Sequence, residues 1–452
     1  MIRFDRSALR TGFGRDVVLD LLERGLAAID PQRLVEDTLS FDGDRLWVGA
    51  SVRRVSGRRV WAIAIGKAAA PMAQAASARL GPALAGGIVL TRNGYGEAVD
   101  GLTVVEAGHP IPDEVGGRAA REIAQLADHV GAGDLVLCLL SGGGSALLAA
   151  PPAGVSIDDL ACTGRLLLES GAPIEEINTV RRHLSSLQGG RLARCLRPAV
   201  VVTLALSDVL GDRPEAIASG PTVPDPTTYD DAVLVLRRHR LWDRVPASVR
   251  DHLIRGSRGA VTETPKPGDP AFSEDTFEIV GNRGTFLDAV VRAGAAAGWG
   301  VIRLDEAMAG EARGVGRNLG RQVVGLASGE PGHTIWTAAG ETTVTVRGSG
   351  RGGRNQELAL AAAREMAGAD RVCLAALATD GTDGVTDAAG ALVDGETVGR
   401  VRRAGIDPTA ALEDNDSYAA LRSSGDLLYT GPTRTNVADI SVAFIERTRT
   451  RL

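Results

Sequence analysis

Short apolar segments alternate with longer segments of helical periodicity through the first half of the chain. The apolar segments carry few polar residues, which is typical of strands buried on both faces of a parallel sheet. We expect strands at 60–66, 86–91, 102–108, 135–140 and 199–206, separated by helices at 68–80, 116–129, 156–170 and 175–195. This alternation predicts a Rossmann-like parallel sheet wrapped by helices, with ligand-binding loops at the carboxyl ends of the strands.

A second α/β region follows a segment rich in proline and glycine at 257–272, which we interpret as a linker or a surface loop. The later pattern predicts strand, turn, helix and strand over 277–304, a hairpin or paired strands over 333–350, a helix at 355–367 and a strand with a loop at 372–384. We therefore expect an α/β protein of two domains, a Rossmann-like one at 1–256 and a smaller one at 273–452. The active site is expected in the cleft between them.

Composition narrows the class of protein. The chain has 452 residues, a length that favours two domains over one core. Its net charge of −6 and its lack of basic blocks argue against nucleic acid as a partner. No apolar run approaches the length of a membrane span, and the four cysteines are far apart, as in reduced cytosolic proteins. We expect a cytoplasmic monomer or homodimer that binds small molecules.

The pentapeptide Ser-Gly-Gly-Gly-Ser at 141–145 directly follows the apolar strand predicted at 135–140. Three consecutive glycines cost backbone entropy, so such a run is typical of places where only a bare backbone fits. At the carboxyl end of a parallel strand, exposed backbone N–H groups can bind an anion such as a phosphate. A tight turn that binds no ligand is the alternative interpretation.

Lysine is nearly absent, because only Lys67 and Lys266 among the 50 basic residues are lysines. Lys67 lies between the strand predicted at 60–66 and the helix that follows it. A cation at a helix start is unfavourable unless an anion lies near it, which indicates contact with a phosphate or a carboxylate. The surrounding residues do not form a Walker A loop. A lysine exposed to solvent is the alternative.

Two loops rich in acidic residues follow predicted strands, at 204–232 and at 378–390. Their carboxylates include Asp208, Asp212 and Asp225 in the first loop, and Asp380, Asp383 and Asp387 in the second. Clustered carboxylates repel one another unless a cation or hydrogen-bond donors hold them, and oxygen ligands of this kind suit Mg²⁺. The alternative for some of them is an Asx turn, in which the carboxylate caps its own backbone.

The segment GSGRGG at 348–353 matches the dinucleotide fingerprint G-x-G-x-x-G between a predicted strand and a predicted helix. A single match of this kind is not specific. Arg351 and Arg354 within and after it favour a phosphate or carboxylate ligand. An oxidoreductase that uses NAD(P)H is therefore one alternative for the chain.

Several motifs together resemble one family, in this order: AIGKAA, AGHPIPDE, SGGGSALL, LSDVLGD with ASGPTVPDPTT, GRNQELAL, ATDGTDG with TDAAGA, and GPTRTNVAD. They resemble the bacterial-type glycerate 2-kinases, which combine a DUF4147 N-terminal region with a MOFRL C-terminal region, here from about residue 333. The resemblance implies transfer of the γ-phosphoryl group of ATP to the 2-hydroxyl of D-glycerate, giving 2-phospho-D-glycerate and ADP, with Mg²⁺. Members are often labelled hydroxypyruvate reductases, so that NAD(P)H-dependent activity is the alternative.

The resemblance also implies which residues form the site. Its functional positions fall on Lys67, Asp208, Arg354 and Asp380 as the catalytic residues. Nucleotide phosphates are expected at Ser141, Gly142, Gly143, Gly144 and Ser145, the substrate at Lys67, Arg354 and Asn355, and the metal at Asp380, Asp383 and Asp208. Which carboxylate meets the metal and which orients the attacking hydroxyl stays open at this point.

Two residues depart from the family pattern. Gln188 stands where a lysine is expected, which would weaken one anion contact, and Arg434 stands where a glycine is usual, which puts the geometry of that turn in doubt. A sensor that binds a small hydroxy acid without catalysis is a third interpretation of the chain, beside the kinase and the reductase.

Overall fold

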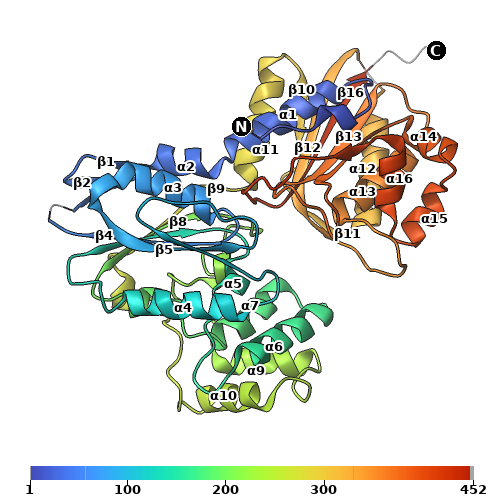
Figure 1. Ribbon diagram of the computed structural model, residues 1–452. Helices are drawn as coiled ribbons and strands as arrows, with labels where there is room; N and C mark the ends of the chain where they lie inside the picture. The colour runs from blue at the N-terminus through green and yellow to red at the C-terminus, as the bar shows by residue number, and fades with distance from the viewer. Residues whose placement is uncertain (1, 56, 329, 448–452) are drawn as a thin grey trace. The chain divides into compact units, whose positions relative to one another are not determined.

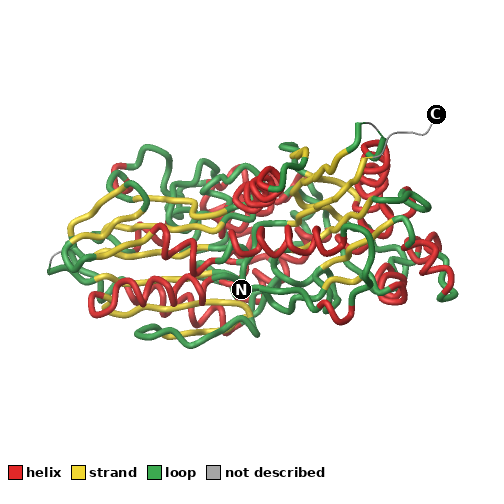
Figure 2. The backbone as a smooth tube through the Cα atoms, turned by 90° about the horizontal axis from the view of Figure 1, so that it is seen from above, coloured by secondary structure: helices red, strands yellow, loops and turns green. Residues whose placement is uncertain are grey.

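The chain folds into two compact units, which we describe separately (Figure 1). The computed structural model describes residues 2–55, 57–328 and 330–447. The central unit comprises residues 31–281, and the terminal unit comprises residues 1–30 together with 282–452. Both units are α/β, and helices accompany the strands in each of them (Figure 2). No helix in the described ranges is both long enough and apolar enough to cross a membrane.

A six-stranded parallel sheet forms the centre of the central unit. Its strands are β4 (Val60–Ile65), β5 (Leu84–Arg92), β6 (Thr103–Ala107), β7 (Leu135–Leu140), β8 (Val200–Leu206) and β9 (Thr276–Gly281). They lie in the order β6-β5-β4-β7-β8-β9, which is the order of doubly wound sheets. The strand order reverses between β4 and β7, and ligands of such sheets bind at the carboxyl ends beside that point.

Helices connect these strands, and a small antiparallel sheet precedes them. The helices are α2 (Pro31–Thr38), α3 (Ala69–Leu80), η2 (Gly81–Ala83), α4 (Glu114–Leu126), α5 (Gly144–Leu147), α6 (Ile157–Glu169), α7 (Ile174–His183), α8 (Arg191–Cys195), η3 (Ile217–Ser219), α9 (Tyr229–Arg238), α10 (Ala247–Ser257) and η4 (Pro270–Phe272). The small sheet contains β1 (Leu39–Phe41), β2 (Arg45–Val48) and β3 (Ser51–Arg54). Buried residues such as Leu167, Val180 and Leu236 give α6, α7, α9 and α10 an apolar core separate from that of the large sheet.

One expectation for this unit needs correction, and for a second segment the structure selects one of two alternatives. The single helix expected at 175–195 is two helices, α7 and α8, because Gly189 and Gly190 adopt left-handed φ angles of 60° and 81° between them. The segment at 257–272 is a loop within the central unit, since it joins α10 to β9. Because β9 hydrogen-bonds to β8 as the sixth strand of the same sheet, the division between the units falls after Gly281.

A mixed sheet forms the centre of the terminal unit. Its strands are β10 (Gly300–Arg303), β11 (Met308–Glu311), β12 (Gly332–Thr343), β13 (Val372–Ala378), β14 (Gly390–Asp394), β15 (Leu427–Leu428) and β16 (Asp439–Arg447). The order is β10-β12-β16-β13-β14-β15, with β11 beside β12. The hairpin or pair of strands expected at 333–350 is wrong, because this segment contributes one long strand to the sheet, β12, which continues through Gly340. A Cβ there would lie 2.1 Å from the carbonyl oxygen of Met308, so this glycine serves strand packing and not a turn.

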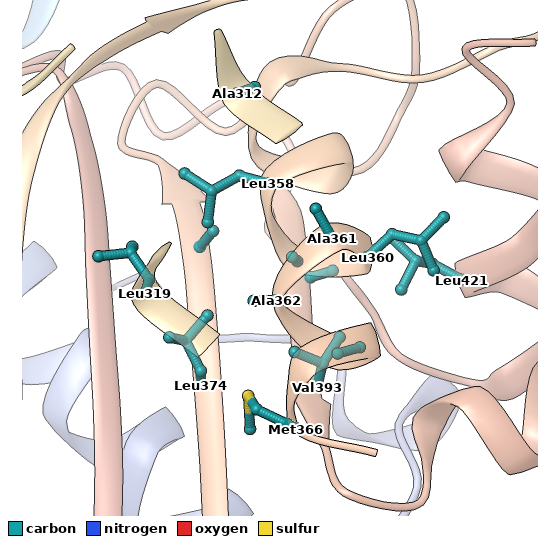
Figure 3. Packing of buried hydrophobic residues seen from close by; sticks show 14 of the residues in the cluster. Ala312, Leu319, Leu358, Leu360, Ala361, Ala362, Met366, Leu374, Val393 and Leu421 are labelled. Atoms are coloured by element: carbon teal, nitrogen blue, oxygen red, sulfur yellow. The ribbon is translucent and has the colours of Figure 1, made fainter. Parts of the chain in front are cut away.

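Helices accompany this sheet in the described part of the terminal unit. They are η1 (Arg6–Ala8), α1 (Arg15–Ala28), α11 (Arg283–Ala296), α12 (Ala312–Leu326), α13 (Arg354–Glu365), α14 (Thr397–Arg403), α15 (Pro408–Glu413) and α16 (Ser417–Ser424). Helix α13 is buried along most of its length. Figure 3 shows Leu358 of α13 on the side of Leu319 and Leu374, and Leu360 directed toward Leu421. A helix that is buried on all sides forms part of a protein core, so α13 gives the residues at its start a rigid support.

The N-terminal helix α1 belongs to the terminal unit, where it packs against α11 and β16 (Figure 1). Gly25 leaves room for the ring of Phe286, which a Cβ would approach to 2.3 Å. The buried guanidinium of Arg15 forms ion pairs with Asp394 at 2.6 Å and with Asp426 at 2.9 Å. Because of these contacts, residues 1–30 belong to the same compact unit as residues 282–452. The sequence predicted domains at 1–256 and 273–452 instead.

We expect Arg15→Leu to lower the free energy of unfolding by about 3 kcal/mol, because breaking a buried ion pair leaves buried carboxylates under-compensated. Urea denaturation would measure the change. Arg33→Leu is the control, since Arg33 and Asp37 are 3.6 Å apart and mostly exposed, and such a pair contributes less than about 1 kcal/mol. Equal midpoints for the two variants would show that the ion pairs of Arg15 do not hold α1 in place.

Candidate active site

The loops after β4 and β7 meet where the strand order of the large sheet reverses. The backbone N–H of Lys67 donates to the carbonyl of Gly142 at 2.9 Å, and the N–H of Ala68 donates to the hydroxyl of Ser141 at 3.0 Å. Gly66 makes this contact possible, because its φ is 128° and a Cβ would lie 2.2 Å from the Ser141 hydroxyl oxygen. The two loops are thus hydrogen-bonded to each other, and Lys67 lies beside the glycine-rich loop.

Two glycines of the 141–145 loop leave room for residues from other loops of the same unit. Gly143 has a left-handed φ of 87°, and a Cβ there would lie 3.1 Å from the ring of His109 and 3.4 Å from Cγ of Lys67. Gly144 faces Ala218, whose Cβ would lie 2.6 Å away from a Cβ on that glycine. The helix α5 that follows has only four residues, so it adds little of the macrodipole that would favour an anion. Protein packing therefore explains part of the glycine run.

His109 is a candidate residue that the sequence analysis did not single out. It follows β6, and its ring lies against Gly143 beside Lys67. The only sequence signal is its place inside the motif AGHPIPDE, directly after an expected strand. Loops from β4, β6 and β7 thus bring a lysine, an imidazole and a glycine-rich backbone to one edge of the sheet.

The serine that ends the glycine-rich loop is held by a second hydroxyl. The hydroxyl oxygens of Ser145 and Ser219 are 2.8 Å apart, and that of Ser219 is 3.2 Å from Oδ1 of Asn178. Ser219 and its neighbour Ala218 adopt left-handed φ angles of 60° and 50°, which non-glycine residues rarely take. This strained turn fixes the position of Ser145.

The acidic loop after β8 contributes residues of two kinds. Asp208 follows the end of β8 and is half-buried at the same sheet edge as the glycine-rich loop, since β8 is paired with β7. Asp225 is fully buried and lies 3.1 Å from the guanidinium of Arg182, so it has a structural partner. Of the carboxylates proposed from the sequence in this loop, Asp208 keeps a position suited to a reaction at the switch point.

In the terminal unit, Arg354 begins α13 and is held by two acidic residues. Its guanidinium contacts Asp439 at 3.0 and 2.5 Å, and Glu341 at 2.7 Å. Burial raises the pKa of Asp439 to about 7, although the cation beside it acts in the opposite direction. Asp439 lies inside the motif GPTRTNVAD, but the sequence analysis gave it no role. The structure thus supplies a buried carboxylate partner for the predicted substrate-binding arginine.

Asp383, proposed as a metal ligand, caps the start of α13. Its carboxylate accepts hydrogen bonds from the backbone N–H groups of Asn355 at 3.1 Å and Gln356 at 2.9 Å, and also from both side-chain amides. The residue is almost fully buried, which raises its pKa. Four donors already hold this carboxylate, so the geometry favours a structural role that fixes Asn355 over a contact with metal.

The other carboxylates of the 378–390 loop have separate partners. Asp380 accepts a hydrogen bond from the N–H of Thr382 at 3.1 Å in an Asx turn, and Asp387 accepts one from the hydroxyl of Tyr418 at 2.7 Å. Within the described part of the chain, no three histidine, cysteine, aspartate or glutamate side chains are grouped to hold a metal ion. Each of these carboxylates could therefore supply one ligand to Mg²⁺, with most of the other ligands coming from substrate phosphates.

The G-x-G-x-x-G segment is packed against acidic residues. Cβ atoms at Gly348 and Gly350 would lie 2.2 Å from Asp414 and 2.4 Å from Asp416. The N–H groups of Ser349 and Arg351 donate to those same carboxylates, at 2.9 and 3.1 Å. Because the backbone donors that a pyrophosphate would need are bound to carboxylates, the geometry argues against a dinucleotide at this segment.

Comparison with known proteins places the chain in a family. The model described as "Domain of unknown function (DUF4147)" matches residues 17–254, and the MOFRL family model matches residues 334–439. Glycerate 2-kinase of Pyrococcus horikoshii is 42% identical over 441 residues, which covers 97% of this chain and 98% of that protein. The chain belongs to the DUF4147–MOFRL glycerate kinase family.

Two further relatives of this glycerate kinase family member are informative. The crystal structure of glycerate kinase from Thermotoga maritima matches it with a TM-score of 0.80 at 39% identity, and the match covers 95% of this chain and 99% of that one. A protein of Agrobacterium vitis with the provisional name hydroxypyruvate reductase is 40% identical over 438 residues, 95% of this chain and 94% of that protein. Both names noted for the family in the sequence analysis thus occur among its relatives.

The two departures from the glycerate kinase pattern have structural explanations. Gln188 is buried, and its side-chain amide donates to the carbonyl of Ser145 at 2.8 Å and to that of Leu148 at 3.3 Å. It supports the backbone of the glycine-rich loop. Arg434 has a left-handed φ of 57°, which agrees with a turn position where glycine would be free of strain.

We expect Asp439 to make the stability of this family member pH-dependent. A folded-state pKa near 7, against about 4 for an unfolded aspartate, means that the folded state binds the proton more tightly. Stability from this group is therefore complete below about pH 4 and is lost as the pH rises through about 7. The unfolding free energy of the native chain minus that of Asp439→Asn should fall between pH 5 and pH 7, by up to about 1.4 kcal/mol per pH unit. Urea denaturation at both pH values measures it, and a constant difference would contradict the shift.

Proposed function

We propose that this protein is a glycerate 2-kinase that transfers the γ-phosphoryl group of ATP to the 2-hydroxyl of D-glycerate, giving 2-phospho-D-glycerate and ADP. The observation that carries the proposal is the 42% identity to a glycerate 2-kinase over nearly the full length of both chains. The meeting of Lys67 with the 141–145 loop at the switch point supports it independently, because that is where doubly wound sheets bind ligands.

Phosphoryl transfer needs positioning and charge neutralisation more than covalent help from the protein. The 2-hydroxyl oxygen of glycerate forms a bond to the γ-phosphorus while the bond from that phosphorus to the bridging oxygen breaks, which releases ADP. In our proposal Gly142, Gly143 and Gly144, with Ser141 and Ser145, cradle phosphates, and Lys67 neutralises charge on them. Asp208 orients the attacking hydroxyl and takes its proton.

The terminal unit contributes Arg354 in this proposal. Its charge is balanced by Asp439 and Glu341, and Asn355 is held by Asp383. Arg354 would bind an anionic group of the substrate through its part-exposed face, while Asp439 keeps the guanidinium in one orientation. Asp383 would act by positioning α13, which differs from the metal-binding role implied by the family resemblance.

Mg²⁺, where it is bound, would supply further neutralisation of the phosphate charge. Asp380 or Asp208 would be its single carboxylate ligand, with the remaining ligands from phosphates and water. Hydroxypyruvate reduction with NAD(P)H is the second candidate function, favoured by the provisional name of the Agrobacterium vitis relative. The acidic surroundings of the 348–353 segment argue against it.

The position of the phosphate in the product tests the proposal. The protein is incubated with ATP and D-glycerate, and the product is then treated with enolase alone. Enolase acts directly on 2-phosphoglycerate, whereas 3-phosphoglycerate requires a mutase first, so we expect phosphoenolpyruvate without added mutase. Oxidation of NAD(P)H by hydroxypyruvate, with no ADP formed from ATP and glycerate, would favour the reductase instead.

We expect Lys67→Arg to lower turnover at least tenfold, about 1.4 kcal/mol of transition-state stabilisation, with little change in melting temperature. The guanidinium is larger, planar and forked, so it cannot replace a compact ammonium without moving the groups that it contacts. Lys266→Arg is the matched control, because Lys266 is the only other lysine of the sequence. Steady-state kinetics of the two variants decide the matter, and native turnover in Lys67→Arg would remove Lys67 from the active site.

A further inference from the structure

A line of three polar side chains connects helix α7 to the end of the glycine-rich loop. Asn178 of α7 is within hydrogen-bond distance of Ser219, and Ser219 is within hydrogen-bond distance of Ser145. Asn178 is 4% exposed and Ser219 is 0% exposed, while Ser145 is half-buried. Ser145 is therefore the member of the line that belongs to the candidate site, and the other two lie behind it.

The middle residue of the line has a backbone conformation that its surroundings enforce. Ser219 and Ala218 have left-handed φ angles of 60° and 50°. The carbonyl of Ser219 accepts a hydrogen bond from the backbone N–H of Gly189 at 3.0 Å. Residues other than glycine keep such angles only where the surrounding structure over-determines them, and such places cluster at functional sites. The strained turn holds the hydroxyl of Ser219 between its two neighbours in the line.

Asn178 is an unusual residue for the buried part of α7. Its neighbours Ile177 and Val180 belong to the apolar core of this helical region. Asparagine favours helices poorly, and a buried amide costs free energy unless its polar atoms are hydrogen-bonded. Its carbonyl oxygen Oδ1 finds its partner in Ser219, 41 residues away along the chain. An apolar residue would suit the packing of α7 better, which indicates that this hydrogen bond serves the glycine-rich loop.

The direction of the two hydrogen bonds follows from the chemistry of the groups. The hydroxyl of Ser219 has one proton, and it lies 3.2 Å from Oδ1 of Asn178, which as a carbonyl oxygen can only accept. The proton of Ser219 is therefore directed to Asn178. In the 2.8 Å contact between the two serines, Ser145 is then the donor and Ser219 the acceptor. The Ser145 hydroxyl keeps its oxygen lone pairs for a further contact but has no second proton to donate.

We propose that Asn178 is a positioning residue of the active site, which acts through Ser219 to present the hydroxyl of Ser145 as a hydrogen-bond acceptor. The inference rests on the proposed kinase function. An ionised phosphate oxygen can only accept, so this hydroxyl serves a donor, and phosphates at 141–145 are left to backbone N–H groups. The side-chain amide of Gln188 holds the carbonyl of the same serine at 2.8 Å. Both the carbonyl and the hydroxyl of Ser145 are thus fixed from within the central unit.

Two substitutions of Asn178 test this role. Asn178→Leu keeps a similar size and removes the acceptor, and we expect kcat to fall at least tenfold in a variant whose circular dichroism is native. Asn178→Asp keeps an acceptor oxygen, so it should restore most of the turnover at a pH where the carboxylate is ionised. As the pH falls, the protonated carboxyl can donate to Ser219 and reverse both hydrogen bonds, so turnover should decline. Burial raises the pKa of such a carboxyl, which puts the decline above about pH 4.

Native turnover in a folded Asn178→Leu variant would overturn the inference. A loss in Asn178→Asp at high pH as large as that in Asn178→Leu would also overturn it, because the acceptor oxygen would then make no difference.

A double-mutant cycle tests whether Asn178 acts through Ser219. Ser219→Ala should lower kcat as Asn178→Leu does, and the double variant should be no slower than either single variant. Alanine is compatible with the backbone there, since Ala218 has a similar φ angle. Thr203→Val is the control, because it breaks a buried hydroxyl contact of 2.9 Å with Thr222 in the same unit and should leave kcat unchanged. Losses that multiply in the double variant would overturn the inference.

Neutron diffraction from crystals of the native protein in D₂O separates this inference from the proposed function. We expect the deuteron of Ser145 to point to Ser219, and that of Ser219 to point to Asn178. The reverse direction would overturn the inference even in an active kinase. If the native protein forms no product from ATP and D-glycerate, the proposed function fails, and the deuteron positions decide whether Asn178 sets the direction of the line. If it is a kinase and Asn178→Leu has native turnover, only the inference fails.

Discussion

The parallel pairing of β4 with β7 is the constraint on which the candidate site depends. It sets the two strands side by side in register from Val60 and Leu135 to Ile65 and Leu140, so both loops leave the sheet at the same height. Gly66 then allows the backbone of one loop to touch the Ser141 side chain of the other. The backbone hydrogen bond from Lys67 to Gly142 then holds the lysine beside the glycine-rich loop.

Packing around the glycine-rich loop shows how one motif can serve structure and ligand binding together. Gly143 and Gly144 are needed by His109 and Ala218, which would explain the glycines in a protein without any ligand. The same packing places Ser145 within hydrogen-bond distance of Ser219, in the strained turn after β8. The close approach that requires glycine therefore also brings Lys67, His109 and the backbone of the loop to one edge of the sheet.

The charged residues at the start of α13 are paired with partners inside the terminal unit. Arg354 forms ion pairs with Asp439 and Glu341. The carboxylate of Asp383 accepts hydrogen bonds from backbone N–H groups at the start of α13. Buried carboxylates of this kind are stable only with donors or cations, and here the protein supplies them from its own backbone and side chains. This explains why the three aspartates at 380–387, close together in sequence, do not converge on one point in space.

The sequence by itself determined the parallel sheet, because apolar strands buried on both faces carry a local signal that helices between them reinforce. It also indicated that the loops carrying Lys67 and residues 141–145 follow strands of that sheet, where parallel sheets bind ligands. Only the tertiary structure decided that β9 joins the first sheet, that α1 packs with α11, and that Asp439 contacts Arg354. Each of these is a contact between residues distant along the chain. Hydrophobic periodicity predicts which face of an element is buried, but it does not specify which distant segment covers that face or which residue pairs with a charge.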